Sequence, residues 1–292
     1  YADDSRIGKT ILQTTSDAYR KLRNTIRYML GALADLSPDE AVELDLMPPL
    51  ERFILHRLWE LDGQVRAAYE GYVFQDVIRP ILDFCQDELS SLFFDIRRDS
   101  LYCDLPSSLT RRAARTVMDA VFERLTAWLG PLIPFTMEEA WLTRFPQGRS
   151  NAMRVMPGTP AEWRNDAEAA RWAKVLAVTS VVTGALEVER REKRLGAALE
   201  AAPTAHVADA DLLAAFEGLD PAEVFRTSEA TLVAGSGAGF RLPEAPGVSV
   251  EPGKAAGHKC ARCWRILPEV TRPAFLCERC DEAVAAWDAA RA

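Results

Sequence analysis

The sequence of 292 residues contains no long hydrophobic run and no excess of positive charge. Because no apolar stretch reaches the roughly 18–20 residues that a membrane helix needs, we expect no membrane association. Lysine and arginine number 35 and aspartate and glutamate number 43, which gives a net charge of −8. Indiscriminate binding of nucleic acid is therefore not expected, and any contact with RNA must come from local basic patches.

Internal repeats, coiled-coil heptads, low-complexity tracts and a secretory signal are also missing. With 48% hydrophobic and 27% charged residues, the composition is that of a globular protein with two or three domains. Cys85 and Cys103 belong to no motif, so we interpret them as buried thiols in a reducing cytosol. Since the chain begins with Tyr1 and not with methionine, we expect it to be part of a longer, cytoplasmic protein.

Four cysteines near the C-terminus form two C-x-x-C pairs, Cys260 with Cys263 and Cys277 with Cys280. Zn²⁺ binds four soft ligands at the corners of a tetrahedron, and two such pairs supply them. We predict one structural Zn²⁺, because four protein ligands leave no open position for a substrate. Two disulfides or four ordinary core cysteines are the alternatives, and the spacing and the missing secretory signal favour zinc.

The segment around these cysteines is positive although the chain is acidic. Between positions 254 and 280 it contains two acidic residues, Glu269 and Glu278, and six basic ones: Lys254, Lys259, Arg262, Arg265, Arg272 and Arg279. Trp264 directly follows a ligand cysteine, where zinc knuckles often expose a side chain that stacks on a base. The alternative is that Trp264 packs beneath the hairpin as its small core.

The first predicted helix begins near Ser16 or Asp17, after a polar segment, and carries two stripes. Apolar residues at helical spacing form the buried stripe. The other stripe contains no carboxylate, and its members follow one another at i, i+3, i+4 and i+7: Arg20, Arg23, Asn24 and Arg27. Such a stripe suits the phosphates and base edges of a nucleic acid, and the alternative is an ordinary solvated face.

Apolar periodicity predicts further long helices, joined by short loops into an antiparallel bundle. They cover residues 50–70, 72–96 with a kink at Pro80, 106–129, and a short segment from 134 to 141. Three arginines stand near the start of the helix at 106–129, where the helix dipole disfavours cations: Arg111, Arg112 and Arg115. Either an anionic partner or solvation would explain them.

The pattern changes after an alanine-rich helix or helix pair at 160–200. Short apolar runs separated by glycine and proline predict strands at 205–208, 231–234 and 248–250 around a helix at 210–217. The predicted fold is mainly α, with an antiparallel helix bundle, a small α/β module and a zinc knuckle held by four cysteines. The expected divisions are the bundle at 1–158, connecting helices at 159–202, the α/β module at 203–253 and the zinc module at 254–292.

Several segments resemble the isoleucyl-tRNA synthetase family of class I. Residues 15–31 resemble the first helix of the anticodon-binding domain of isoleucyl, valyl and leucyl enzymes, and residues 89–102 and 132–141 are similar to its later helices. Residues 192–201 are similar to the segment that follows, although the stretch 196–199 has alanine where the family has serine. The two C-x-x-C pairs with Trp264 are typical of many bacterial isoleucyl enzymes, and their valyl and leucyl relatives lack them.

This resemblance implies the C-terminal, tRNA-holding portion of a bacterial isoleucyl-tRNA synthetase. The whole enzyme would attach isoleucine to tRNA(Ile) with ATP, which would bind in a catalytic domain outside this chain. The class I signatures H-I-G-H and K-M-S-K-S are absent, so we expect no catalytic residues and no activity of this chain alone. The expected partners are the anticodon stem-loop and the N-terminal catalytic and editing domains, and a monomer is expected.

Single-stranded anticodon bases can be stacked and read on their edges. In this hypothesis the stripe of Arg20, Arg23, Asn24 and Arg27 faces the stem-loop. The zinc knuckle contacts the loop through four further residues: Lys259, Arg262, Trp264 and Arg265.

Two other functions are compatible with a terminal zinc knuckle. One is a zinc-stapled protein-interaction module without any role in RNA binding. The other is a DNA glycosylase of the formamidopyrimidine type, whose terminal zinc finger looks similar. Those enzymes use an N-terminal proline as nucleophile, whereas this chain starts with Tyr1 and consists mainly of long helices.

Overall fold

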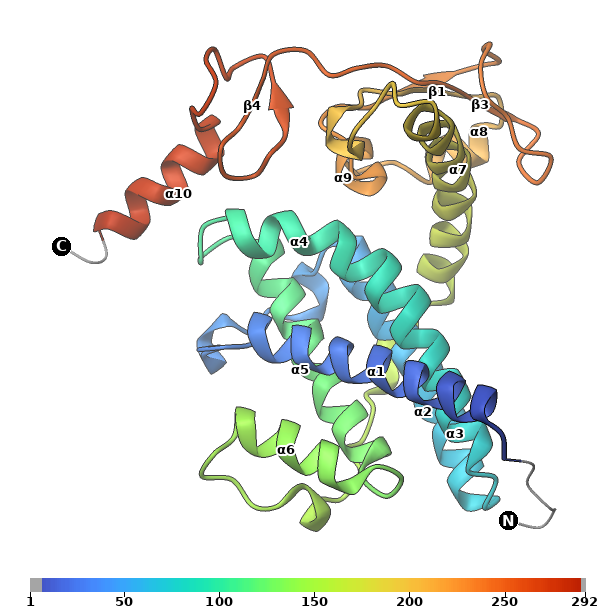
Figure 1. The fold of residues 1–292 in the computed structure, drawn as a ribbon, viewed down its shortest axis with the longest axis vertical. Coiled ribbons are helices and arrows are strands. Elements are labelled where there is room, and N and C mark those ends of the chain that lie inside the picture. The colour runs from blue at the N-terminus through green and yellow to red at the C-terminus, as the bar shows by residue number, and fades with distance from the viewer. Residues whose placement is uncertain (1–6, 290–292) are drawn as a thin grey trace. The chain divides into compact units, whose positions relative to one another are not determined.

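The computed structural model describes residues 7–289, which form two compact units (Figure 1). The first unit contains the residues up to Phe94 together with Arg112–Arg164, and the second contains Asp95–Arg111 and the residues from Asn165 onward. None of the described helices combines the length and the apolar character that crossing a membrane requires. The four-part division of the sequence given above stays a prediction.

The first unit is built from helices, as the apolar periodicity predicted. They are α1 (Lys9–Ala32), α2 (Pro49–Glu70), α3 (Gln75–Asp83), the π-helix η3 (Phe84–Phe93), most of α5 (Leu109–Leu129) and α6 (Pro134–Arg144). Short 3₁₀ turns connect them: η1 (Pro38–Glu40), η2 (Leu44–Leu46), η4 (Asn151–Met153) and η5 (Ala161–Trp163). Phe93, Phe122 and Trp128 are fully buried at its centre. Burying each such side chain contributes about 1.5–3 kcal/mol.

Helix α1 begins at Lys9, so the predicted start at Ser16 or Asp17 was wrong. The polar residues before Ser16 belong to the helix, and the hydroxyl groups of two threonines among them bond to its own backbone. Thr14 Oγ1 donates to the carbonyl oxygen of Thr10, and Thr15 Oγ1 donates to that of Ile11, both over 3.0 Å. Further along the helix Leu22, Ile26 and Met29 are buried at the predicted helical spacing.

The single kinked helix predicted at 72–96 is instead a series of three helices: α3, η3 and α4 (Phe94–Cys103). Pro80 lies inside α3, and the ten residues of η3 follow in the π conformation. In a π-helix the backbone bonds span five residues. Two serine hydroxyls make the same span, since Ser90 donates to the carbonyl of Cys85 and Ser91 to that of Gln86, both over 2.8 Å.

The second unit combines helices with two small sheets. Its helices are α4, α7 (Asp166–Arg191), α8 (Ala210–Ala214), α9 (Pro221–Phe225), α10 (Glu278–Ala289) and the 3₁₀ turn η6 (Ala198–Glu200). The strands are β1 (Thr204–Val207), β2 (Thr231–Ala234), β3 (Val248–Glu251), β4 (His258–Lys259) and β5 (Ile266–Leu267). The three strands predicted from apolar runs correspond to β1, β2 and β3, and the predicted helix at 210–217 is the shorter α8.

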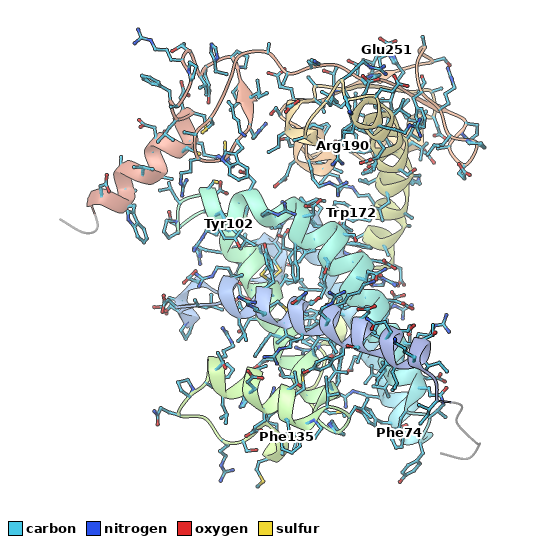
Figure 2. All side chains as sticks on the ribbon, viewed as in Figure 1. Phe74, Tyr102, Phe135, Trp172, Arg190 and Glu251 are labelled. Carbon is cyan, nitrogen blue, oxygen red and sulfur yellow. The ribbon has the colours of Figure 1, made fainter. Side chains whose placement is uncertain are left out.

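The larger sheet has the order β2-β1-β3, with β2 parallel and β3 antiparallel to β1. Its buried face presents Ala205, Val207 and Val250, and α7 packs against β3. Trp172 of α7, labelled in Figure 2, is only 1% exposed. Helix α7 ends at Arg191, so the helix or helix pair predicted at 160–200 was too long. Lys193 has a left-handed φ of 59° that cannot continue the helix.

Candidate zinc centre and nucleic-acid interface

The four cysteines of the two C-x-x-C pairs meet in the second unit. Cys260, Cys263, Cys277 and Cys280 are all buried, and their Sγ atoms lie within 4.8 Å of one another. The Sγ atoms of Cys263 and Cys277 are 3.8 Å apart. A tetrahedron with Zn–S bonds of about 2.3 Å has edges of about 3.8 Å, whereas a disulfide needs about 2.05 Å. The donor set therefore fits Zn²⁺, and the alternative of two disulfides was wrong.

A short hairpin of β4 and β5 carries the first cysteine pair. Gly257 opens it with φ of 103°, and a Cβ at this position would come within 2.1 Å of the carbonyl oxygen of Leu267. The Cys260 N–H donates to the carbonyl of Arg265 over 2.8 Å, which closes the turn. Val270, Leu267 and Leu276 pack around the cysteines as the small apolar core.

Main-chain groups favour a thiolate at Cys260. Burial would raise the pKa of this thiol, but hydrogen bonds with the backbone N–H groups of Cys263, Cys277 and Arg262 lower it to about 6. The Cys277 N–H donates to Cys260 Sγ over 3.3 Å. Bound Zn²⁺ would supply a structural crosslink between the two turns and no open coordination position.

Trp264 is exposed and does not form the core of the hairpin. Its side chain is 59% exposed, and Lys259 Nζ lies 5.0 Å from the ring centroid. Its φ of 69° is left-handed, a strained conformation for a bulky residue. A cavity of about 390 Å³ opens beside the ring, and its wall includes His258, Lys259, Pro273 and Ala274. The interpretation of Trp264 as a small core was therefore wrong.

The two arginines predicted beside Trp264 are directed at the main chain of the same unit. Arg262 donates to the carbonyl oxygens of Tyr102 and Cys103 over 2.9 and 2.5 Å. Arg265 donates to the carbonyl oxygen of Ser228 over 2.6 Å. Both side chains are half-buried, and a direct role of either in RNA binding stays a prediction.

In the first unit the polar stripe of α1 is exposed along its whole length. Arg20 pairs with Asp17 over 3.0 Å, and Arg23 makes two bonds to Glu139 of α6 over 2.8 and 3.1 Å. The hydrogen bond and the charge of Glu139 raise the pKa of Arg23, and those of Arg23 lower the pKa of Glu139. The side chains of Asn24 and Arg27 make no hydrogen bond or ion pair within residues 7–289.

Sequence reasoning missed Phe135 at the start of α6. Its side chain is 90% exposed and projects from the helix end (Figure 2). The next residue, Thr136, shares a hydrogen bond of 2.8 Å with Tyr19 of α1, so Phe135 lies close to the α1 stripe. Helical periodicity could have predicted this exposure. The buried residues of α6 are Met137 and Ala140, and Phe135 falls outside the stripe that they form.

The arginines at the start of α5 bind groups of the chain itself, so neither an external anion nor solvation is needed to explain them. Arg115 is 3% exposed and donates to the carbonyl oxygens of Ala32 and Ala34, at the end of α1, and to the Glu40 carboxylate. Arg112 donates to three carbonyl oxygens of residues 39–41. Arg111 donates to the carbonyl oxygen of Leu101 over 3.3 Å. The end of a helix leaves carbonyls without partners, and these cations satisfy them.

Comparison with known proteins gives two family matches. The family described as the anticodon-binding domain of tRNA ligase matches residues 51–205. The family described as the zinc finger found in FPG and IleRS matches residues 257–283. The second match and the cluster of four cysteines together establish a structural zinc site. The first match decides against the glycosylase alternative, which would share the zinc finger alone.

The chain is also similar to isoleucine–tRNA ligases of bacteria. The protein of Caulobacter vibrioides is 68% identical over 295 residues, which cover 100% of this chain and 30% of that protein. The proteins of Agrobacterium fabrum and Brucella abortus are 54% and 51% identical over 272 residues, covering 92% of this chain and 28% of each relative. The chain thus spans less than a third of the length of these relatives.

Proposed function

The chain belongs to the family of anticodon-binding domains of tRNA ligases, and on that basis we propose that it is the tRNA-holding part of an isoleucine–tRNA ligase. The complete enzyme attaches isoleucine to tRNA(Ile) with ATP. This chain alone lacks the H-I-G-H and K-M-S-K-S signatures and does not aminoacylate. The protein acts as a cytoplasmic monomer, and its catalytic and editing domains are its other partners.

The exposed surface of α1 and the start of α6 is the observation that carries this proposal. Asn24 and Arg27 present donors to solvent, and Phe135 presents a ring on which a base can stack. Arg20 and Arg23 sit in exposed ion pairs, which contribute little in water. A phosphate of the anticodon stem-loop can therefore replace Asp17 or Glu139 as their partner.

The zinc module supplies a second contact to the RNA. An unpaired base stacks on the exposed face of Trp264, and Lys259 beside it binds a phosphate. The strained backbone of Trp264 and of Ala274, whose φ is 68°, borders the cavity next to this ring. Arg262 and Arg265, bonded to carbonyl oxygens of the same unit, add positive potential to the module.

A filter-binding titration with tRNA at two salt concentrations tests the proposal. Arg27→Ala should weaken binding by ~1–3 kcal/mol and make the affinity less dependent on salt. Arg79→Ala removes an exposed arginine from α3 of the same unit and is the matched control. If the chain bound no tRNA at either salt concentration, the protein-interaction module would become the better function.

A substitution of Glu139 should change tRNA affinity in the opposite direction to a substitution of Arg27. Glu139→Gln releases Arg23 from its ion pair and should strengthen tRNA binding, whereas Arg23→Ala should weaken it. Unchanged affinity in Arg23→Ala, Arg27→Ala and Glu139→Gln together would remove α1 from the interface.

Trp264→Ala tests the zinc module. Loss of base stacking should cost ~1–3 kcal/mol of tRNA affinity. Trp287→Ala is its control, because Trp287 on α10 is similarly exposed, at 56%, and lies away from the cavity wall. Equal affinities of the two variants would exclude stacking on Trp264.

A further inference from the structure

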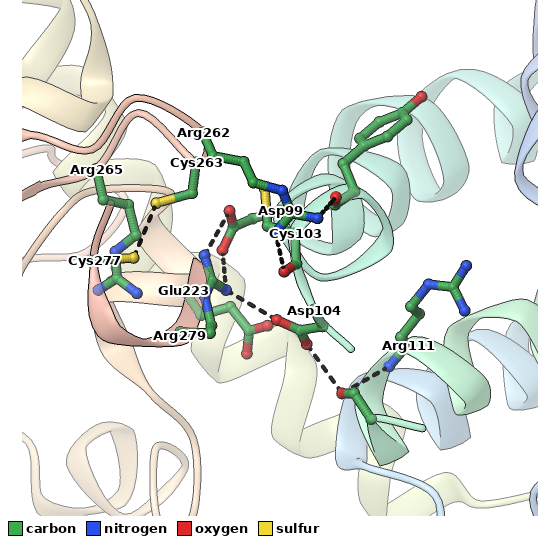
Figure 3. A network of polar contacts seen from close by, with 12 residues as sticks. Asp99, Cys103, Asp104, Arg111, Glu223, Arg262, Cys263, Arg265, Cys277 and Arg279 are labelled. Carbon is green, nitrogen blue, oxygen red and sulfur yellow. Dashed lines mark hydrogen bonds and ion pairs between the residues drawn. The ribbon is translucent and has the colours of Figure 1, made fainter. Parts of the chain in front are cut away.

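Each C-x-x-C turn carries an arginine immediately before its second cysteine: Arg262 precedes Cys263 and Arg279 precedes Cys280. Both guanidinium groups contact α4, which belongs to the same compact unit as the zinc module (Figure 3). Two turns that are distant in sequence from α4 are thus fixed to the last residues of this one helix.

Arg262 binds the C-terminal end of α4. Its guanidinium donates to the carbonyl oxygens of Cys103 and Tyr102 over 2.5 and 2.9 Å. The last carbonyls of a helix have no partner inside it and carry partial negative charge. A cation at this point satisfies them and fixes the first cysteine turn to the helix end.

Arg279 fixes the second cysteine turn through carboxylates. It makes two bonds to Asp99, over 2.5 and 3.0 Å, and a third to Asp104 over 3.1 Å. Asp104 also accepts a hydrogen bond of 3.0 Å from Ser108, so its carboxylate is held in place (Figure 3). A bidentate arginine–carboxylate ion pair fixes the orientation of the two side chains as well as the distance between them.

The space between these two contacts is packed. The buried Cys103 side chain, at the end of α4, lies in the same apolar cluster as the four zinc-binding cysteines. Trp264 and Lys259 take no part in the contacts with α4, and both remain exposed.

We propose that Arg262 and Arg279 are positioning residues that hold the zinc module on α4 and so set the direction in which Trp264 and Lys259 face tRNA. This inference rests on the proposed function. It assigns the two arginines to the contact with α4, whereas sequence alone suggested that basic residues of this segment bind RNA.

The double variant Asp99→Asn with Asp104→Asn separates positioning from charge. It removes two negative charges, so electrostatics alone predicts tighter binding of tRNA. Loss of the contact to Arg279 predicts the opposite, about tenfold weaker binding, because the recognition surface is no longer held. Asp281→Asn with Glu282→Gln is the control, since it removes two exposed carboxylates from α10 without touching α4. The double variant at Asp99 and Asp104 is called the α4 variant below. If it bound tRNA as tightly as this control, the proposal would be overturned.

Zinc content and hydrogen exchange complete the experiment. The α4 variant should retain its zinc and exchange faster at residues 99–104 and 258–267 than the wild-type chain. Loss of zinc would overturn the positioning role, because the contacts would then serve the folding of the metal site itself. Exchanging the charges, with Asp99→Arg and Arg279→Asp in a chain that keeps Asp104→Asn, should restore slow exchange.

Failure of the proposed function gives a different result. If the wild-type chain binds no tRNA, the proposed function is wrong. The contact between the zinc module and α4 is then tested by hydrogen exchange alone. Unchanged exchange in the α4 variant would overturn that contact whether or not tRNA binds.

Discussion

Arg115 offers the sharpest test of how the first unit is held together. This residue is 3% exposed, and its guanidinium connects three points of the chain: the carbonyl oxygens of Ala32 and Ala34, over 3.0 and 2.7 Å, and the carboxylate of Glu40. Arg115→Met keeps most of the apolar stem and removes the guanidinium. The two carbonyls at the end of α1 and the Glu40 carboxylate would then lose their shared donor.

The expected cost follows from these contacts. Removing one partner of a buried ion pair costs about 3–5 kcal/mol, and Glu40 is 22% exposed, which places the ion-pair loss near the lower limit. Ala34 is exposed and Ala32 is only half-buried, so water can replace the guanidinium at these two carbonyls and their loss adds little to this figure. We therefore expect a loss of about 3–5 kcal/mol in the free energy of unfolding. With a slope of about 2 kcal/mol per molar urea, the midpoint falls by about 2 M.

Urea denaturation followed by circular dichroism measures this loss. Arg27→Met is the matched control, because it makes the same change on the exposed surface of α1 and should stay within about 0.5 kcal/mol of the wild type. A wild-type urea midpoint for Arg115→Met, with weaker tRNA binding, would refute the reasoning and return Arg115 to the role of an anion contact.

Three further outcomes follow from the structure. Cys263→Ser should lose zinc and disorder residues 254–280, because metal binding and folding are coupled in such modules; elemental analysis with hydrogen exchange checks this, and a protected, metal-free segment would contradict it. Burial raises the pKa of Tyr69 to about 12, so the folded state keeps this proton more tightly than the unfolded state. This proton contributes at most about 3 kcal/mol to the free energy of unfolding; the contribution is complete below about pH 10 and is lost by about pH 12. The urea midpoint should therefore fall between these pH values in the wild type, and Tyr69→Phe should lack this part of the fall. Burial, aided by the charge of Glu88, raises the pKa of the Cys85 thiol far above its usual range, so a thiol reagent followed by mass spectrometry should label Cys85 only after unfolding.

The zinc ligands could be predicted in full because their geometry is local. A C-x-x-C turn brings two sulfurs together whatever surrounds it, and a second turn completes the tetrahedron. Helices such as α2 were predictable for a similar reason, since their buried residues recur at helical spacing. The start of α1 was not, because threonine hydroxyls that favour caps in general bond here to carbonyls inside the helix. The π-helix η3 was also missed, since the apolar residues from Phe84 to Phe93 fit ordinary helical spacing.

The partners of the arginines could not be predicted because they lie far away in sequence. Arg115 and Glu40 are 75 residues apart, Arg23 and Glu139 are 116 apart, and Arg262 and Cys103 are 159 apart. The sequence shows where arginines stand, but only tertiary contacts show whether an arginine is already bonded to a carboxylate or a carbonyl of the protein itself. The absence of carboxylates from the α1 stripe therefore did not mean the absence of carboxylates beside it.

Because several arginines of the zinc module are bonded within the protein, fewer positive groups are available to RNA than the sequence suggests. Arg262, Arg265 and Arg279 are bonded to carbonyls or carboxylates of their own unit, so counting them as phosphate contacts overstates the binding charge. Lys259 and Arg272 stay exposed, and each lies over an aromatic ring, Trp264 and Phe275, at 5.0 and 5.9 Å from the ring centroid. Two cation–aromatic pairs on a metal-bound frame favour stacking of unpaired bases over neutralisation of many phosphates. An acidic chain can in this way select a single-stranded loop without attracting nucleic acid in general, because the net charge of −8 opposes contacts that stacking does not support.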